Sequence, residues 1–257
     1  MRYESTTGFS DEQVREIVRR VEQVLAGRPS WPVGLPRMFC VSELVVIALL
    51  LLRQNWTQEA TADVYGVSQP TISRVKRGMV PLLDQVVCLH EPDPELVFAN
   101  RIVLVDGSDV PTGNRKNTGK DNYSGKRHRQ GLNIQVAASL DGELLAVSVP
   151  VQGCRHDRRA LTETGWEQLL ADYQWLADSA YQGTNATTPT KRTKTRDLTN
   201  HEKTVNRAIS SRRAAVERAI GHLKNWKILS RGYRGRLKEL PAIISIVTRL
   251  EFYRLGW

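Results

Sequence analysis

The hydrophobic period of the chain changes near residue 97, and this change limits the folds that the sequence can adopt. Before it, apolar residues recur at the spacing of amphipathic helices, as in the segment that begins at a Ser10–Gln13 capping box. After it, apolar runs of strand length are separated by turn residues. Segment 91–95 holds two prolines and is typical of a linker. We therefore predict an all-α domain over residues 1–96 and an α/β domain over residues 97–257.

The first domain is expected to contain an apolar helix from Ser42 through Leu52 and a helix-turn-helix over residues 57–79. A helix from Thr57 would end at Gly66, and Ser68 would cap the next helix. That helix would display side chains of the types that read base edges and contact phosphates. They are Gln69, Thr71, Ser73, Arg74 and Lys76. Any two packed helices can share this pattern, so a purely structural helix pair is the alternative.

The second domain reads as a sheet covered by helices. Strands are expected at residues 101–105, 131–139, 143–149 and 175–177, with a helix capped by Asp157 between the last two and a long helix over about 204–226. Three strands, a helix, a fourth strand and later helices describe an α/β fold with helices on the sheet.

Two aspartates follow predicted strands, and a glutamate lies on the long helix. Asp106 and Asp178 each end a strand, so neighbouring strands can hold them a few ångströms apart, where a divalent cation such as Mg²⁺ or Mn²⁺ relieves their repulsion. The alternative is that either one caps a turn. Glu217 is expected at the polar edge of the buried helix stripe, facing inward beside Arg213 and Lys224. The alternative there is a surface ion pair between Arg213 and Glu217.

Positive charge is concentrated in two stretches. Fifteen Lys or Arg residues lie between positions 185 and 238 against three acids, a second basic stretch covers 113–129, and the remainder of the chain is acidic. This distribution favours binding to a nucleic acid backbone over a merely solubilising surface. No membrane-length apolar run is present, and the three cysteines form no C-x-x-C pair. We expect a cytoplasmic, nucleoid-associated protein.

Four sets of motifs resemble a DDE transposase of the bacterial insertion-sequence kind, within the fourth and fifth families and their Harbinger-like relatives. They are 105–108 (Val-Asp-Gly-Ser) with 123–126 (Tyr-Ser-Gly-Lys), 153–157 (Gly-Cys-Arg-His-Asp), 177–183 (Ala-Asp-Ser-Ala-Tyr-Gln-Gly) with Pro189 and Lys191, and Arg213-x3-Glu217-x6-Lys224. The family often has a tyrosine three residues before the arginine, and Ser210 stands there in this chain.

The resemblance implies an RNase H-like catalytic domain in which Asp106, Asp178 and Glu217 hold two Mg²⁺ ions, with Mn²⁺ as a possible substitute. Arg213 and Lys224 would contact phosphates near the cut, and Tyr123 and Lys126 would also contact DNA. The partners it implies are double-stranded DNA, in the form of terminal inverted repeats and a target, and a second copy of the chain in a homodimer on DNA. Two rivals remain, namely a metal-dependent nuclease of the same fold without strand transfer and a catalytically silent DNA-binding regulator.

Overall fold

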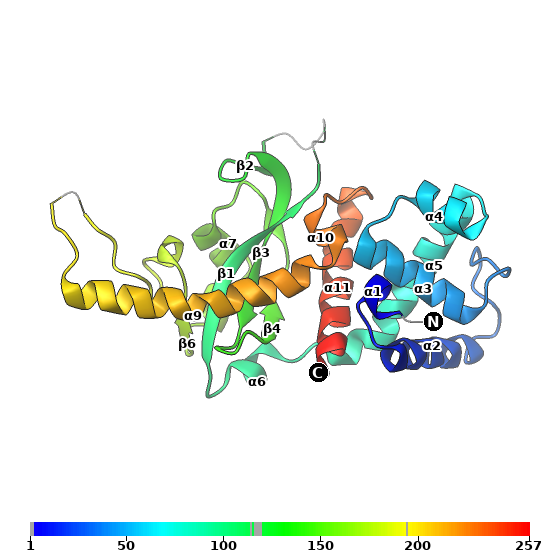
Figure 1. The fold of residues 1–257 in the computed structure, drawn as a ribbon, viewed down its shortest axis with the longest axis horizontal. Helices are drawn as coiled ribbons and strands as arrows, with labels where there is room; N and C mark the ends of the chain where they lie inside the picture. Colours follow the sequence, from blue (N-terminus) through cyan, green and yellow to red (C-terminus); the bar gives the residue numbers. More distant parts are fainter. Residues whose placement is uncertain (1–2, 114, 116–119, 194) are drawn as a thin grey trace. The chain divides into compact units, whose positions relative to one another are not determined.

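The chain folds into two compact units, each described here by itself. In the computed structural model, which describes residues 3–113, 115, 120–193 and 195–257, the helical unit comprises Met1–Glu91, Asn225–Arg231 and Ala242–Trp257. The sheet unit comprises Pro92–Lys224 and Gly232–Pro241 (Figure 1). The C-terminal helix therefore packs with the first unit, whereas the sequence analysis groups all residues after 96 together.

The helical unit is built around the apolar helix α3. Its helices are α1 (Glu4–Thr7), α2 (Asp11–Ala26), α3 (Val41–Gln54), α4 (Gln58–Tyr65), α5 (Gln69–Val87), the 3₁₀ turn η1 (Cys88–His90), α10 (Lys227–Ser230) and most of α11 (Leu240–Leu255). The predicted capping box is confirmed, since Ser10 Oγ accepts from Gln13 N and Gln13 Oε1 accepts from Ser10 N. The predicted cap at Ser42 is wrong, because α3 starts from Cys40, whose N–H donates to Glu43 Oε2 at 2.8 Å.

Helices α4 and α5 are joined by a tight turn. Thr57 Oγ1 accepts from Ala60 N at 3.1 Å, and α4 ends at Gly66 with φ +64°, as its position in the sequence predicts. Helix α5 begins after Ser68 but continues through Pro81 to Val87, beyond the expected end at residue 79. A run of buried apolar side chains around Pro81 explains the continuation, since packing outweighs the missing backbone hydrogen bond. The role of this helix pair in DNA binding stays a prediction.

Chain segments from both ends of the sequence meet at a buried carboxylate. Glu251 of α11 is 1% exposed, and its Oε2 accepts from Trp226 Nε1 at 2.8 Å. The guanidinium of Arg53, from α3, lies over the Trp226 ring at 5.0 Å from its centroid, with its Nη1 at 4.0 Å from Glu251 Oε2. A buried ion needs such partners, so the C-terminal residues are part of the core of the helical unit.

The sheet unit holds one mixed sheet. Its elements are α6 (Pro94–Phe98), β1 (Ile102–Pro111), β2 (Tyr123–Ser124), β3 (Arg129–Ala138), β4 (Leu144–Val147), β5 (Val151–Gln152), α7 (Asp157–Glu163), α8 (Trp166–Leu169), β6 (Gln174–Leu176), η2 (Ser179–Tyr181), α9 (Asn200–Lys224) and η3 (Leu237–Glu239). Strand β3 pairs antiparallel with β1 and with the short strands β2, β4 and β5, and β6 pairs parallel with β1. The predicted mixed sheet flanked by helices is confirmed, and it is consistent with a DDE nuclease fold.

Two local expectations in this unit are wrong. Strand β1 does not end at Asp106 but runs on to Pro111, because β3 pairs with it as far as Gly131. The helix expected to be capped by Asp157 is capped instead by His156, whose Nδ1 accepts from Arg159 N at 3.3 Å. Gly165, with φ +77°, then separates α7 from α8.

Helices cover both faces of the sheet. Helix α9 crosses β1 and β3 (Figure 1), and its Arg213 reaches Asp106 on one face. Helix α7 packs against β3 and η2, and its Asp157 reaches Asn133, whose partner across the β1–β3 ladder is Asp109. Because successive strand residues point to opposite faces, Asp106 and Asp109 mark the α9 and α7 sides respectively.

Candidate active site

Asp106 lies in the middle of β1 with both carboxylate oxygens engaged. Oδ1 accepts from the N–H of Gly107 at 2.8 Å, and Oδ2 accepts from Arg213 Nη2 at 3.1 Å. Each of the two side chains is 19% exposed. Burial raises the pKa of Asp106 above its ordinary value, Asp178 and Asp157 raise it further, and Arg213 and the Gly107 N–H act in the opposite direction. The group therefore carries its negative charge at a cost that a bound cation would reduce.

Asp178 follows the neighbouring strand β6 and lies close enough to Asp106 to raise the pKa of that carboxyl group. The parallel pairing of β1 and β6 ends at Leu104 and Leu176, so each aspartate comes two residues after the last pair. Asp178 also caps the η2 turn, with Oδ1 accepting from Ala180 N at 2.8 Å. The predicted position of Asp178 directly after a strand is confirmed. The two carboxylates are hard oxygen donors of the type that Mg²⁺ prefers.

Glu217 lies one turn after Arg213 on α9, and its side chain is exposed. The expectation that it faces inward along the sheet is therefore wrong. The buried face of α9 includes Ala215 and Ala219 besides Val216, and these small residues move its centre to roughly 130° from Glu217 at about 100° per residue. The alternative ion pair with Arg213 does not describe the site either, since Arg213 is paired with Asp106.

Across the described part of the chain, no group of three or more His, Cys, Asp or Glu side chains is arranged to hold a metal ion. Asp106 and Asp178 nevertheless fit such an ion, because each follows the last pair of two adjacent strands by two residues, and the nearby Asp178 raises the pKa of Asp106, a repulsion that a cation would relieve. The third predicted ligand, Glu217, is on the adjacent helix α9, where its side chain is exposed.

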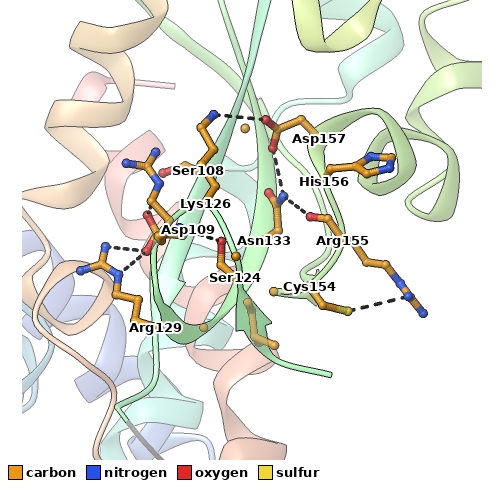
Figure 2. Close-up of a pocket in the computed structure, with 16 residues that line it drawn as sticks. Ser108, Asp109, Ser124, Lys126, Arg129, Asn133, Cys154, Arg155, His156 and Asp157 are labelled. Atoms are coloured by element: carbon orange, nitrogen blue, oxygen red, sulfur yellow. Dashed lines mark hydrogen bonds and ion pairs between the residues drawn. The ribbon is translucent and has the colours of Figure 1, made fainter. Parts of the chain in front are cut away.

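A pocket opens on the α7 side of β1 (Figure 2). Its residues come from β1, the β2–β3 hairpin, and the segment leading into α7. Lys126 Nζ lies 4.0 Å from Asp157 Oδ2, while Arg129 donates to Asp109 Oδ2 at 2.5 and 2.9 Å. The rim is thus cationic, with its charges supported by two carboxylates.

Lys224, at the end of α9, also meets Asp109. Its Nζ donates to the backbone carbonyl of Asp109 and lies 3.8 Å from Oδ1. Burial lowers the pKa of Lys224, and Asp109 partly offsets this effect.

Of the other predicted DNA-contacting side chains in this unit, Tyr123 in β2 is 43% exposed and Lys126 is 73% exposed. The structure therefore gathers Arg213, Lys224, Tyr123 and Lys126 in one unit with Asp106 and Asp178.

Gly107 cannot carry a side chain in this arrangement. A Cβ at Gly107 would lie 2.1 Å from Asp157 Oδ1, so the carboxylate of α7 sits directly over the backbone beside Asp106. Asp157 is not among the residues predicted for the site, and neither are Asn133, Gln135 and Tyr181, which are linked to it by successive hydrogen bonds. The sequence did hold a sign of Asn133 and Gln135. These two polar residues alternate with apolar residues on a strand whose two faces are both covered.

The predicted DNA-reading residues lie on the first turns of α5 in the helical unit. Arg74 is exposed, and Thr71, Ser73 and Lys76 are partly exposed. Gln69 Nε2 donates to Gln58 Oε1 of α4, so this side chain also links the two helices.

In the described residues, no helix is both long enough and apolar enough to span a lipid bilayer.

Comparison with known sequences defines the class. A family described as DDE superfamily endonuclease matches residues 105–251, which is more than half of the chain. The chain belongs to this family. It is also similar to the putative transposase for insertion sequence element IS112 from Streptomyces albus G, with 28% identity over 228 residues that cover 87% of this chain and 83% of that protein. The resemblance to a DDE transposase of the insertion-sequence type is thereby confirmed. No solved structure gives a significant match.

Proposed function

We propose that this protein is a DNA transposase that binds the ends of an insertion sequence, cleaves phosphodiester bonds there and joins a DNA 3′ end to a target. The observation that carries the proposal is the placement of Asp106 and Asp178, each two residues after the last pair of the parallel strands β1 and β6, with Arg213 bonded to Asp106. These residues lie within the segment that matches the endonuclease family.

In this proposal Asp106 and Asp178 would hold two Mg²⁺ ions, for which Mn²⁺ can substitute, together with Glu217, whose exposed side chain on α9 would turn toward them. When bound, the ions supply Lewis-acid activation of water or a 3′-hydroxyl and stabilise the leaving oxygen. The protein side chains do the remaining work. Arg213 and Lys224 bind phosphate oxygens near the cut, Arg213 as a fork and Lys224 as a point charge. Tyr123 and Lys126, both exposed, contact the DNA beside them.

DNA recognition is assigned to α4 and α5 as a helix-turn-helix. The side chains that would read the terminal inverted repeats or contact their phosphates are Gln69, Thr71, Ser73, Arg74 and Lys76. Because two element ends must be joined to one target, the protein would act as a homodimer on double-stranded DNA, in association with the nucleoid. The concentration of positive charge in residues 185–238 supports binding to a DNA backbone in general.

The experiment is incubation with a labelled DNA end, target plasmid and Mg²⁺, scoring nicked and joined products. We expect both products from the wild-type protein and neither from Asp178→Ala, which should still bind DNA because it loses no phosphate contact. Asp172→Ala is the matched control, since Asp172 is an exposed acid just before β6. Nicking without joining would favour a nuclease, and binding without either product would favour a silent regulator.

A further inference from the structure

Four polar side chains form a hydrogen-bonded chain between the turn after Asp178 and the start of α7. The Tyr181 hydroxyl donates to Gln135 Oε1, Gln135 Nε2 donates to Asn133 Oδ1 at 3.3 Å, and Asn133 Nδ2 donates to Asp157 Oδ1 at 3.0 Å. We call Tyr181, Gln135, Asn133 and Asp157 the polar chain. Each donor points toward Asp157, so an oxygen acceptor at that end completes the series.

The polar chain is buried, which is unusual for side chains of these types. Tyr181 and Gln135 are 0% exposed, Asn133 is 8% exposed, and the Asp157 side chain is 16% exposed. Apolar side chains would fill a strand face covered by helices at lower cost, because buried polar groups must each find a partner. A fully bonded internal network of this kind specifies one geometry more than it adds stability.

Each end of the polar chain lies beside one of the two aspartates, Asp178 at one end and Asp106 at the other. At one end, the N–H of Tyr181 donates to the Asp178 carbonyl at 3.2 Å, within the η2 turn that Asp178 caps. At the other end, Asp157 Oδ1 lies over Gly107, whose N–H donates to Asp106 Oδ1. The polar chain therefore connects the η2 turn, which Asp178 caps, with the backbone at Gly107, which binds Asp106. It does so through side chains of β3 and α7.

This connection matters because no backbone pairing between β1 and β6 holds the two aspartates beside each other. The pairing of β1 with β6 stops at Leu104 and Leu176, before either aspartate. We propose that the residues of the polar chain are positioning residues, which hold Asp106 and Asp178 at the separation at which the pair binds a divalent metal ion. The inference rests on the proposed metal-dependent function and adds to it the device that sets the geometry of the site.

The test uses the full-length protein and Mn²⁺ alone as the probe. Tyr181→Phe removes the first donor and keeps the ring, which packs edge-on against Trp175. Tyr173→Phe is the matched control, because the Tyr173 hydroxyl donates to the Glu95 carbonyl at 3.3 Å within the same unit, outside the polar chain. For each protein, Mn²⁺ affinity is measured by electron paramagnetic resonance, and the melting temperature is recorded without metal.

We expect Tyr181→Phe to weaken Mn²⁺ binding roughly tenfold or more, the effect of losing groups that orient metal ligands. Tyr173→Phe should bind Mn²⁺ as the wild type does. Gln135→Met, which breaks two links at once, should weaken binding at least as much, and adding Tyr181→Phe to it should change nothing further. A lower melting temperature with unchanged Mn²⁺ affinity in Tyr181→Phe would overturn the inference, since it is the mark of a purely structural role.

Hydrogen exchange separates this inference from the proposed function. Backbone amides of residues 178–184 should exchange faster in Tyr181→Phe than in the wild type, and no faster in Tyr173→Phe. If the wild-type protein binds no Mn²⁺, the proposed function fails, and the exchange rates alone then decide whether the polar chain holds the Asp178 turn. Unchanged exchange in Tyr181→Phe overturns the inference whether or not the metal binds.

Discussion

Arg213 of α9 donates a hydrogen bond to Asp106 of β1 at 3.1 Å, across 107 positions of sequence. The carboxylate thus has a positive partner before any metal or DNA arrives, and it already accepts from the Gly107 N–H through its other oxygen. A guanidinium held against this carboxylate is also close to where a scissile phosphate would lie in the proposed function. In the proposed function, this one side chain would therefore link the acidic site to the substrate backbone.

Arg213→Gln is expected to lower the single-turnover cleavage rate by roughly 10²-fold while changing DNA affinity little. A contact that tightens as charge develops in the transition state affects the rate more than ground-state binding. The measurement is cleavage of a labelled DNA end beside a binding titration. Arg212→Gln provides the control, because Arg212 is the exposed neighbour on the same helix. Equal losses of rate and affinity would show that Arg213 is an ordinary phosphate contact.

Asp106 should make the metal-free protein less stable as pH rises. Its pKa in the folded protein is raised, chiefly by burial, so the folded state binds more protons than the unfolded state between the ordinary and the raised pKa. The free energy of unfolding then falls with rising pH in that window. The Asp106→Asn variant resembles the protonated form. Its melting temperature should be higher than that of the wild type at pH values above this window, and equal to it at pH values below the window.

Thermal unfolding in the presence of a chelator, recorded across acidic to neutral pH, checks this prediction. Mg²⁺ should then raise the melting temperature of the wild type and leave that of Asp106→Asn unchanged, since a ligand stabilises only the state that binds it. A variant that melts lower than the wild type at neutral pH would mean that the Arg213 ion pair outweighs the cost of burial.

Arg74→Ala combined with Lys76→Ala should weaken binding to a specific DNA end and spare metal-dependent nicking of random DNA at low salt. Both residues lie on the first turns of α5, and nicking depends on the sheet unit. Arg15→Ala, at an exposed position of α2, is the comparison. Unchanged specific binding would move recognition to another surface, with Arg19, Arg20 and Arg28 as the next candidates.

Replacing Arg231, Arg234 and Arg236 together with Gln should flatten the dependence of log affinity on log salt by roughly two to three units. All three are exposed and follow the helix that carries Glu217. Each phosphate contact on duplex DNA contributes about 0.9 to the slope. The loss should be the same for specific and random sequences, and a salt titration of both tests it. A sequence-dependent loss would mean that these arginines read bases.

Local signals in the sequence predict local structure well in this chain. Ser10 with Gln13 begins α2, and Gly66 ends α4, because a cap depends on residues a few positions apart. The short strand before Asp178 is predicted for the same reason, since a brief apolar run followed by turn residues is a local pattern.

The features that sequence reasoning missed depend on distant partners. Polar residues after Asp106 stay in β1 because β3 pairs with them, as in the match of Asp109 with Asn133. Glu217 is turned outward because two alanines, which carry little hydrophobic signal, take part in the buried face of α9. The sequence pattern predicts Asp157 only as a helix cap, whereas the structure places it over Gly107.

The buried Glu251 has a consequence for how the protein is made. Arg53 and Trp226 depend on this carboxylate, which lies near the end of the chain, so the helical unit cannot complete its core while the ribosome is still translating the sheet unit. A truncated polypeptide that ends before α11 leaves the Arg53 guanidinium buried without its counter-charge. Premature release from the ribosome therefore leaves the core of the helical unit incomplete, and with it the helices to which DNA recognition is assigned in the proposed function.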